Sequence, residues 1–256
     1  PTYNLLAPGT SGIIEGQAGQ VLPGAVKVRS IAIGGTNTGR GIPNVGVDLV
    51  SDLDPETNPT ASCVGEGNTA LSDATGVTSC DVKLGGVIGG PVPIRVRAGG
   101  GGRDAGTEYT VFLTVTAGPP NLIEILGGDG QSGGPGVTLP TALSAAISDG
   151  FGHYLPDTEV TWEVAPPGSA TIVSSTNVTN AQGRVSAQVQ LGTTGGPVEI
   201  RLRAGAAQAV FNLTVNIPVA SLNLVSGNNQ TALINQPFAA PLVVQALNAQ
   251  GQPAAG

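Results

Sequence analysis

The sequence predicts an all-β protein in which antiparallel β-sandwiches follow one another along the chain. Residues 69–99 recur as residues 176–205 with one single-residue gap, so a unit of structure is repeated. The composition, with 40 glycines, 20 prolines and no methionine, leaves few good helix formers. Apolar and polar residues alternate over 185–191 and again over 198–204, as they do in strands that bury one face.

The repeat also predicts the domain organisation. We expect one sandwich over residues 1–118, a second over 119–219, and the first strands of an incomplete third over 220–256. Short junctions that contain proline, at 117–121 and 217–221, separate these parts and restrict bending more than Gly/Ser linkers would. Because the chain starts at Pro1 and has no methionine, we expect it to be a piece of a longer protein.

The individual strands follow from the same alternation. In the first unit we expect an edge strand and its crossing within 1–24, and strands over 26–33, 45–49 and 109–115. In the second unit we expect strands over 143–147, 160–164, 170–172 and 211–215. Both units close with a strand, a Gly-Gly-Pro turn and a further strand, and the turns fall at 89–91 and 195–197.

Composition argues against two kinds of partner. The net charge is −7 and the only lysines are Lys27 and Lys83, so no basic stripe is available for a phosphate backbone and nucleic acid is not expected. No run approaches the roughly 18 apolar residues of a membrane span. No charged and then apolar signal segment opens the chain. With 3% aromatic residues, the cores must consist of Val, Ile, Leu and Ala, which suits several small sandwiches.

The second unit carries a set of short motifs that point to a known family. They are Gly152, Pro156, Val-Thr-Trp at 160–162, Ser-Ala-Thr at 169–171, Thr-Asn-Ala-Gln-Gly at 179–183, Leu-Gly at 191–192, Gly195, and Ala-Gly at 204–205. With these motifs, residues 121–217 resemble the bacterial immunoglobulin-like domain found in tandem in adhesins of the invasin and intimin type. The first unit follows the pattern more loosely, because it lacks the tryptophan and has a longer loop at 51–67. The resemblance implies tandem immunoglobulin-like sandwiches, a spacer or adhesive role on a bacterial surface, and no catalytic residue.

The two cysteines lie at positions that the repeat makes comparable with two alanines. Cys63 corresponds to Ala170 and Cys80 to Ala187, both small and inward in the predicted strands. Cysteines in place of a facing alanine pair favour a disulfide, worth about 3 kcal/mol in the chain-entropy model, and an oxidising compartment. The alternative is two unpaired buried thiols. A metal site would need more ligands than two thiols and one distant histidine.

An acidic loop in the first unit is the only candidate metal site. Asp48, Asp52, Asp54 and Glu56 place carboxylates at alternate positions, which calcium could use between tandem domains. The loop lacks the glycine and the terminal glutamate of an EF-hand. The competing interpretation is a solvated loop broken by proline, and no other cofactor is expected.

Three patterns that suggest enzymes are interpreted as structural. Residues 130–134 match the G-x-S-x-G nucleophile motif, but this chemistry requires a strand-to-helix elbow and a histidine base, and no helical pattern follows. His153, the only histidine, falls in a predicted turn and is expected at the surface. The glycine run 99–102 lacks the Lys-Ser or Lys-Thr of a phosphate-binding loop and is expected to be a flexible hairpin end. We therefore expect no enzymatic activity.

The aromatic residues separate two functional interpretations. Trp162 alternates with Val160 and Val164, so it is expected to fill a sandwich core instead of forming an exposed sugar platform. The alternative function is a polysaccharide-binding module of a secreted protein, with platforms among Tyr3, Tyr109, Phe151 and Tyr154. The shortage of aromatic rings favours the structural interpretation.

The incomplete third repeat predicts contact with another molecule. A two-stranded piece is marginal in water, and its apolar residues need a cover. We expect the segment to dock head to tail onto another copy of the chain by strand pairing, in a contact that builds a filament. The expected docking residues are Leu233, Phe238, Leu242, Val244 and Leu247. The alternative is packing on the second unit of the same chain. The sequence is thus expected to be an extracellular module of a bacterial surface fibre or adhesin stalk.

Overall fold

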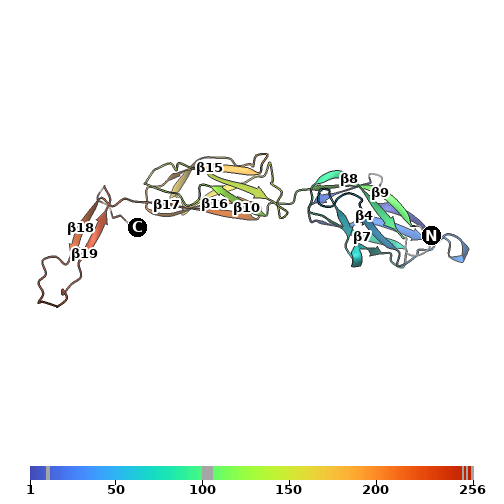
Figure 1. Ribbon diagram of the computed structural model, residues 1–256, viewed down its shortest axis with the longest axis horizontal. Helices are drawn as coiled ribbons and strands as arrows, with labels where there is room; N and C mark the ends of the chain where they lie inside the picture. Colours follow the sequence, from blue (N-terminus) through green and yellow to red (C-terminus); the bar gives the residue numbers. More distant parts are fainter. Residues whose placement is uncertain (10–11, 100–105, 250, 252, 255–256) are drawn as a thin grey trace. The chain divides into compact units, whose positions relative to one another are not determined.

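The computed structural model describes residues 1–9, 12–99, 106–249, 251 and 253–254. The chain divides into two compact units, Pro1–Gly118 and Pro119–Gly256 (Figure 1). The regular elements of the described residues are β-strands and two short 3-10 helices, so the prediction of an all-β, immunoglobulin-like fold is confirmed. No helix in this part of the chain is long and apolar enough to cross a membrane.

The first unit is a sandwich of two sheets, with strand orders β1-β3-β7-β5 and β2-β9-β8-β4-β6. Its elements are β1 (Thr2–Ala7), β2 (Ile13–Gln17), β3 (Val21–Ile31), η1 (Gly35–Asn37), β4 (Gly46–Val50), β5 (Ala61–Cys63), η2 (Glu66–Asn68), β6 (Ala70–Leu71), β7 (Val77–Leu84), β8 (Gly89–Ala98) and β9 (Thr107–Thr116).

Alternating residues of these strands form the first core. Val28 of β3 and Val82 of β7 face Val96 of β8 and Leu113 of β9, and all four are fully buried. The lysine and arginine side chains between them point outward, as the alternation predicts. The expected strand over 26–33 is two residues too long, because β3 ends at Ile31 and Ile33 is exposed.

The second complete sandwich repeats this plan with the orders β10-β12-β15-β14 and β11-β17-β16-β13. Its strands are β10 (Leu122–Gly127), β11 (Ser132–Gly133), β12 (Leu143–Ser148), β13 (Thr161–Ala165), β14 (Ala170–Ser175), β15 (Arg184–Leu191), β16 (Gly196–Ala204) and β17 (Ala207–Val215). Leu143 and Ile147 of one sheet and Ile200 and Phe211 of the other are fully buried in its core. The remaining strands, β18 (Ser221–Ser226) and β19 (Val243–Leu247), form a separate two-stranded sheet.

The turns predicted at 89–91 and 195–197 fall instead at the starts of β8 and β16, and the crossings between sheets come before them. β7 and β8 belong to different sheets, as do β15 and β16, and each of β8 and β16 instead pairs with the strand that follows it. In the first unit Gly89 and Pro91 lie inside β8, where its register with β9 shifts between Gly89 and Val92. The crossing therefore carries the chain from one layer of the sandwich to the other.

Each sandwich also contains one parallel pair beside its antiparallel strands. β2 runs parallel to β9, and β11 runs parallel to β17. In both units the first strand region splits, because its first part joins one sheet and its second part the edge of the other. Glycines interrupt the chain between the two parts in both units, together with Pro8 in the first, which lets the chain change sheets.

One turn is built alike in both units, and it requires glycine. Gly76 and Gly183 have φ values of 80° and 68°, in the region that favours glycine. A Cβ atom on Gly76 would lie 2.3 Å from the carbonyl oxygen of Ser30, and one on Gly183 would lie 2.9 Å from that of Ile147. The turn therefore holds the start of β7 or β15 close against the neighbouring strand.

Candidate interaction sites

The two cysteines form a disulfide inside the first sandwich. Cys63 of β5 and Cys80 of β7 are joined with a Cα–Cα distance of 5.3 Å, and both are buried. The comparable alanines of the second sandwich, Ala170 and Ala187, are buried on β14 and β15. The disulfide thus fills a place that two methyl groups fill in the other unit.

The carboxylates of the acidic loop bond to arginines and to the backbone of the loop itself. The Nε of Arg97 donates to Oδ1 of Asp48 at 3.0 Å, and this carboxylate holds the pKa of the guanidinium above its ordinary value. The guanidinium of Arg95 lies 2.6 Å from Asp52. Asp54 accepts the backbone N–H of Glu56 at 3.0 Å. The described residues contain no group of three acidic, histidine or cysteine side chains that could hold a metal.

His153 is not the surface histidine that the sequence suggests. Its Nδ1 lies 2.8 Å from Oδ2 of Asp149, whose side chain is completely buried, while the imidazole keeps 22% of its surface exposed. Oδ1 of Asp149 accepts the backbone N–H groups of Phe151 and His153, so the carboxylate organises the whole turn. The sequence does contain a signal for this contact: an aspartate stands four residues before the histidine, with two glycines between them.

The G-x-S-x-G match has no catalytic geometry. Ser132 lies in β11, opposite Thr214 of β17, and the chain continues into a turn. Gln131 beside it is structural, since its side-chain amide bonds to the backbone of Gly128 and Thr141. Of the glycine run 99–102, only Gly99 falls within the described residues; 100–102 lie outside them.

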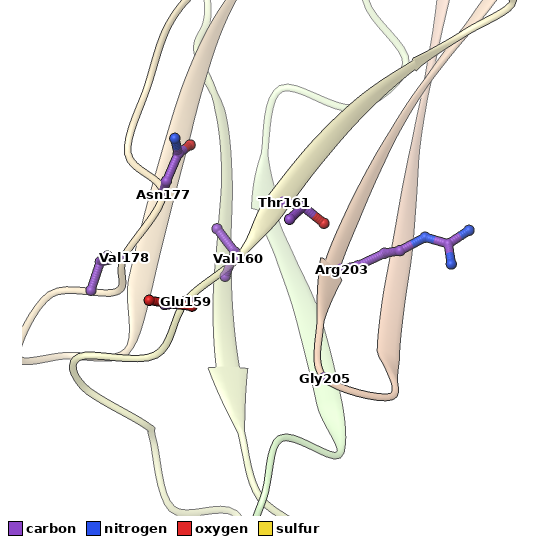
Figure 2. Close-up of a pocket in the computed structure, with 7 residues that line it drawn as sticks. All are labelled: Glu159, Val160, Thr161, Asn177, Val178, Arg203 and Gly205. Carbon is purple, nitrogen blue, oxygen red and sulfur yellow. The ribbon is translucent and has the colours of Figure 1, made fainter.

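A shallow groove lies where the β13 and β16 strands of the second sandwich meet the segment before β15 (Figure 2). The groove is lined by Glu159, Val160, Thr161, Asn177, Val178, Arg203 and Gly205. Thr161 pairs with Arg203 in the same way that Asp48 pairs with Arg97 in the first unit. Since threonine replaces the aspartate, Arg203 has no intramolecular carboxylate among the described residues. Glu159 and Arg203 bring charge to the groove, and Thr161 and Asn177 bring hydrogen-bonding groups. The lining includes no nucleophile with an adjacent base.

The aromatic candidates divide into packed and exposed residues. The ring of Trp162 lies 5.9 Å from that of Phe211, and its Nε1 donates to the Thr176 carbonyl at 3.1 Å, so it packs on the core while remaining half exposed. Tyr3 is buried, and the hydroxyl of Tyr109 donates to its carbonyl.

Phe151 and Tyr154 are the exposed pair of the four proposed sugar platforms. Their exposed fractions are 52% and 54%. The Phe151 ring stacks on His153, with centroids 6.5 Å apart.

The β18–β19 hairpin reproduces the first hairpin of the second sandwich. Leu222 pairs with Ala246, as Ile123 pairs with Ile147, and both hairpins have a register shift at the end of their first strand. Gln230 bonds to the backbone of Gly227 and Ala240 with the same three hydrogen bonds that Gln131 makes. Residues 220–247 therefore have the same local structure as residues 121–148.

The apolar side of this hairpin is uncovered. We call it the tail surface and define it by Leu222, Leu233, Phe238, Leu242 and Val244. Leu242 is 65% exposed, whereas its counterpart Leu143 is fully buried, and Phe238 is 55% exposed against 1% for Leu139. Leu247, the fifth expected docking residue, is half-buried. Within the hairpin itself, no described residue covers the tail surface.

No protein-family model and no curated protein matches this chain. Solved structures similar to it include adhesins of the type that the sequence resembles. The D00-D0 domain of intimin is 12% identical, with 84% of this chain and 98% of that one covered and a TM-score of 0.38. FdeC, an Escherichia coli adhesin, is 17% identical over 100% of this chain and 75% of its own, with a TM-score of 0.40. Domains 4 and 5 of the S-layer protein SbsC are 18% identical over 61% and 75%, with a TM-score of 0.34.

Proposed function

We propose that the chain is a non-enzymatic structural module of a bacterial extracellular fibre or adhesin stalk. The observation that carries the proposal is that two sandwiches with complete cores follow one another, while their charged and polar side chains mainly hold turns and strands in place. A disulfide in the first sandwich suits an oxidising location outside the cell. Such a module acts by resisting unfolding and by keeping a distance between the parts on either side of it.

Single-molecule pulling on the full chain tests this role. We expect two separate unfolding events, one for each sandwich, with the disulfide-containing unit releasing less chain. Reduction should lengthen that event by about 50 Å, since the disulfide spans 17 residues of extendable backbone. Antibodies against the chain should label intact cells of the source bacterium. Unfolding without measurable resistance, or labelling only after lysis, would contradict the proposal.

We further propose that copies of the chain associate head to tail through the tail surface. An apolar side chain left in water costs roughly 25 cal/mol per Å² of its apolar area, so covering this face favours association. The hairpin also presents an unpaired strand edge, which is a template for another strand. Because a heterologous contact of this kind does not close on itself, it builds a filament.

A polysaccharide-binding module is the second candidate, and the exposure of Phe151 and Tyr154 favours it. Exposed rings on a rigid turn can stack on sugar faces, and Asp149 fixes this turn from within. A glycan array probed with the full chain and with Tyr154→Ala tests it. Binding that the substitution abolishes supports this candidate, and an array without signal removes it.

A further inference from the structure

In each sandwich a strand from the start of the unit runs parallel to the strand that closes it. β2 lies parallel to β9, and β11 lies parallel to β17; we call these two the terminal pairs. Because the strands are parallel, the chain enters the first strand at one end of the pair and leaves the last strand at the opposite end. Tension along the chain therefore slides the two strands past each other and loads all their hydrogen bonds together.

The strand before each terminal pair meets the tension first. β1 pairs with β3, and its register shifts between Leu5 and Ala7. β10 pairs with β12 in the same way, with a shift between Ile125 and Gly127. Release of either strand leaves the other strands of both sheets paired, so the tension then reaches the terminal pair. Separation of that pair parts the first strand from the last and opens the core.

The terminal pair of the first sandwich is the longer one. The register of β2 on β9 is regular over five residues, Ile13–Gln17. At the start of the pair, the N–H of Phe112 donates to the Gly12 carbonyl at 2.7 Å. At its end, the N–H of Ala18 donates to the Thr116 carbonyl at 2.9 Å. Many backbone bonds thus share the tension in this unit.

The terminal pair of the second sandwich is shorter. Two residues, Ser132 and Gly133, are in register with β17. The N–H of Gly130 also donates to the Asn212 carbonyl at 2.9 Å. The N–H of Asn212, however, donates to the side chain of Asp129 at 2.6 Å, so the backbone pairing ends there. A shorter run of backbone pairing therefore shares the tension in this unit.

We propose that the terminal pairs set the mechanical resistance of the chain, and that the first sandwich withstands more force than the second because its pair is longer. This inference rests on the proposed role as a stalk module and names the contact that performs it. The disulfide lies outside the first terminal pair, since it joins β5 to β7. Reduction should therefore lengthen the unfolding event of the first sandwich without lowering its unfolding force.

The direction of pulling on the full, oxidised chain tests the first terminal pair. Handles at the two ends of the chain slide β2 along β9. Handles on residues introduced at Gly9 and Glu108 instead pull both strands where they start, so their bonds break one at a time. A side chain at Gly9 would meet open space, and Glu108 is exposed. The unfolding force of the first sandwich, at one loading rate, should fall severalfold in the second geometry.

Two proline substitutions on the β2 side of the pair provide matched variants. Ala18→Pro removes the N–H that donates to Thr116, so it should lower the unfolding force of the first sandwich. Glu15→Pro should leave this force unchanged, because alternate N–H groups of β2 face the open edge, where proline is tolerated. The N–H of Gln17 faces that edge and bonds to the side chain of Gln20 at 2.8 Å. The melting temperature of each variant shows whether it remains folded.

The outcomes separate this inference from the proposed function. Equal forces in the two pulling directions, or a lower force after reduction, would show that the first terminal pair is not the barrier. A higher force for the event whose length reduction leaves unchanged would place the stronger unit second. In each of these cases the inference is wrong, although both sandwiches still resist tension as a stalk must. If neither sandwich resists measurably, the proposed function itself fails.

Discussion

Asp73 and Asn180 occupy the same turn in the two sandwiches, and each holds it with one side-chain oxygen. Oδ1 of Asp73 accepts the backbone N–H groups of Thr75 and Val77 at 2.8 and 3.0 Å. Oδ1 of Asn180 accepts those of Gln182 and Arg184 at 2.9 and 3.0 Å. The geometry is shared, but only the aspartate can be protonated.

The first prediction is a pH dependence confined to the first sandwich. The hydroxyl of Thr75 and the N–H of Val77 hold the pKa of Asp73 below its ordinary value of 3.8. A lowered folded-state pKa means that the carboxylate contributes stability fully above pH 3.8 and loses it as the pH falls through the folded-state pKa. Asp73→Asn should therefore flatten the acid side of the stability profile of this unit, measured by urea unfolding. Asn180→Asp should create such a slope in the second unit, and a profile unchanged by either substitution would contradict this account.

The second prediction concerns the disulfide. Cys63→Ala with Cys80→Ala should lower the free energy of unfolding of the first sandwich by about 3 kcal/mol, because the unfolded chain loses its constraint. The packing should survive, since alanines fill the comparable buried sites of the second sandwich. Differential scanning calorimetry should show one transition shifting and the other staying in place. Trp162, the only tryptophan, reports the unshifted transition by fluorescence.

The third prediction is a stabilising substitution in the first core. The hydroxyls of Ser30 and Thr78 are buried and have no hydrogen-bond partner, and the comparable residues of the second sandwich are Ile147 and Val185. Thr78→Val keeps the shape and removes the buried polar atom, so it should raise the free energy of unfolding by about 1 kcal/mol. Urea unfolding at neutral pH measures the change. Thr179→Val is the contrasting control, since the Thr179 hydroxyl bonds to the Leu155 carbonyl and its loss should destabilise the chain.

The fourth prediction is that calcium leaves the first sandwich unchanged. Asp48 and Asp52 already pair with Arg97 and Arg95, and a calcium ion would have to displace both arginines. The melting temperature should be equal in millimolar calcium and in chelator. A rise with calcium that Asp54→Asn abolishes would restore the metal interpretation of this loop.

Period-two alternation was sufficient to predict the strands that bury one face. Val185 to Leu191 and Val198 to Ala204 lie inward and outward as predicted, because a strand with one buried face leaves a clear pattern. Comparison of the two repeats also identified Ala170 and Ala187 as inward positions, and through them the cysteines. Comparison with the second repeat also made the start of a third repeat recognisable in the sequence.

Other features left no periodic signal. β11 has two residues, Ser132 and Gly133, too few to show alternation, so its parallel pairing with β17 could not be predicted. The pairs Arg95–Asp52 and Arg97–Asp48 depend on which strands become neighbours in the sheet. His153 was misplaced because a histidine in a glycine-rich turn is usually solvated, and here the buried Asp149 draws it inward.

The sequence contains no ionisable side chain beyond Arg203, so the side chains of the tail hairpin carry no charge. Acidification and added salt, which tune contacts between charged surfaces, act little on a surface of this kind. Temperature acts on it directly, because the attraction between apolar surfaces weakens on cooling. An assembly held by the tail should therefore loosen in the cold and re-form on warming, and charge screening by moderate salt should change it little.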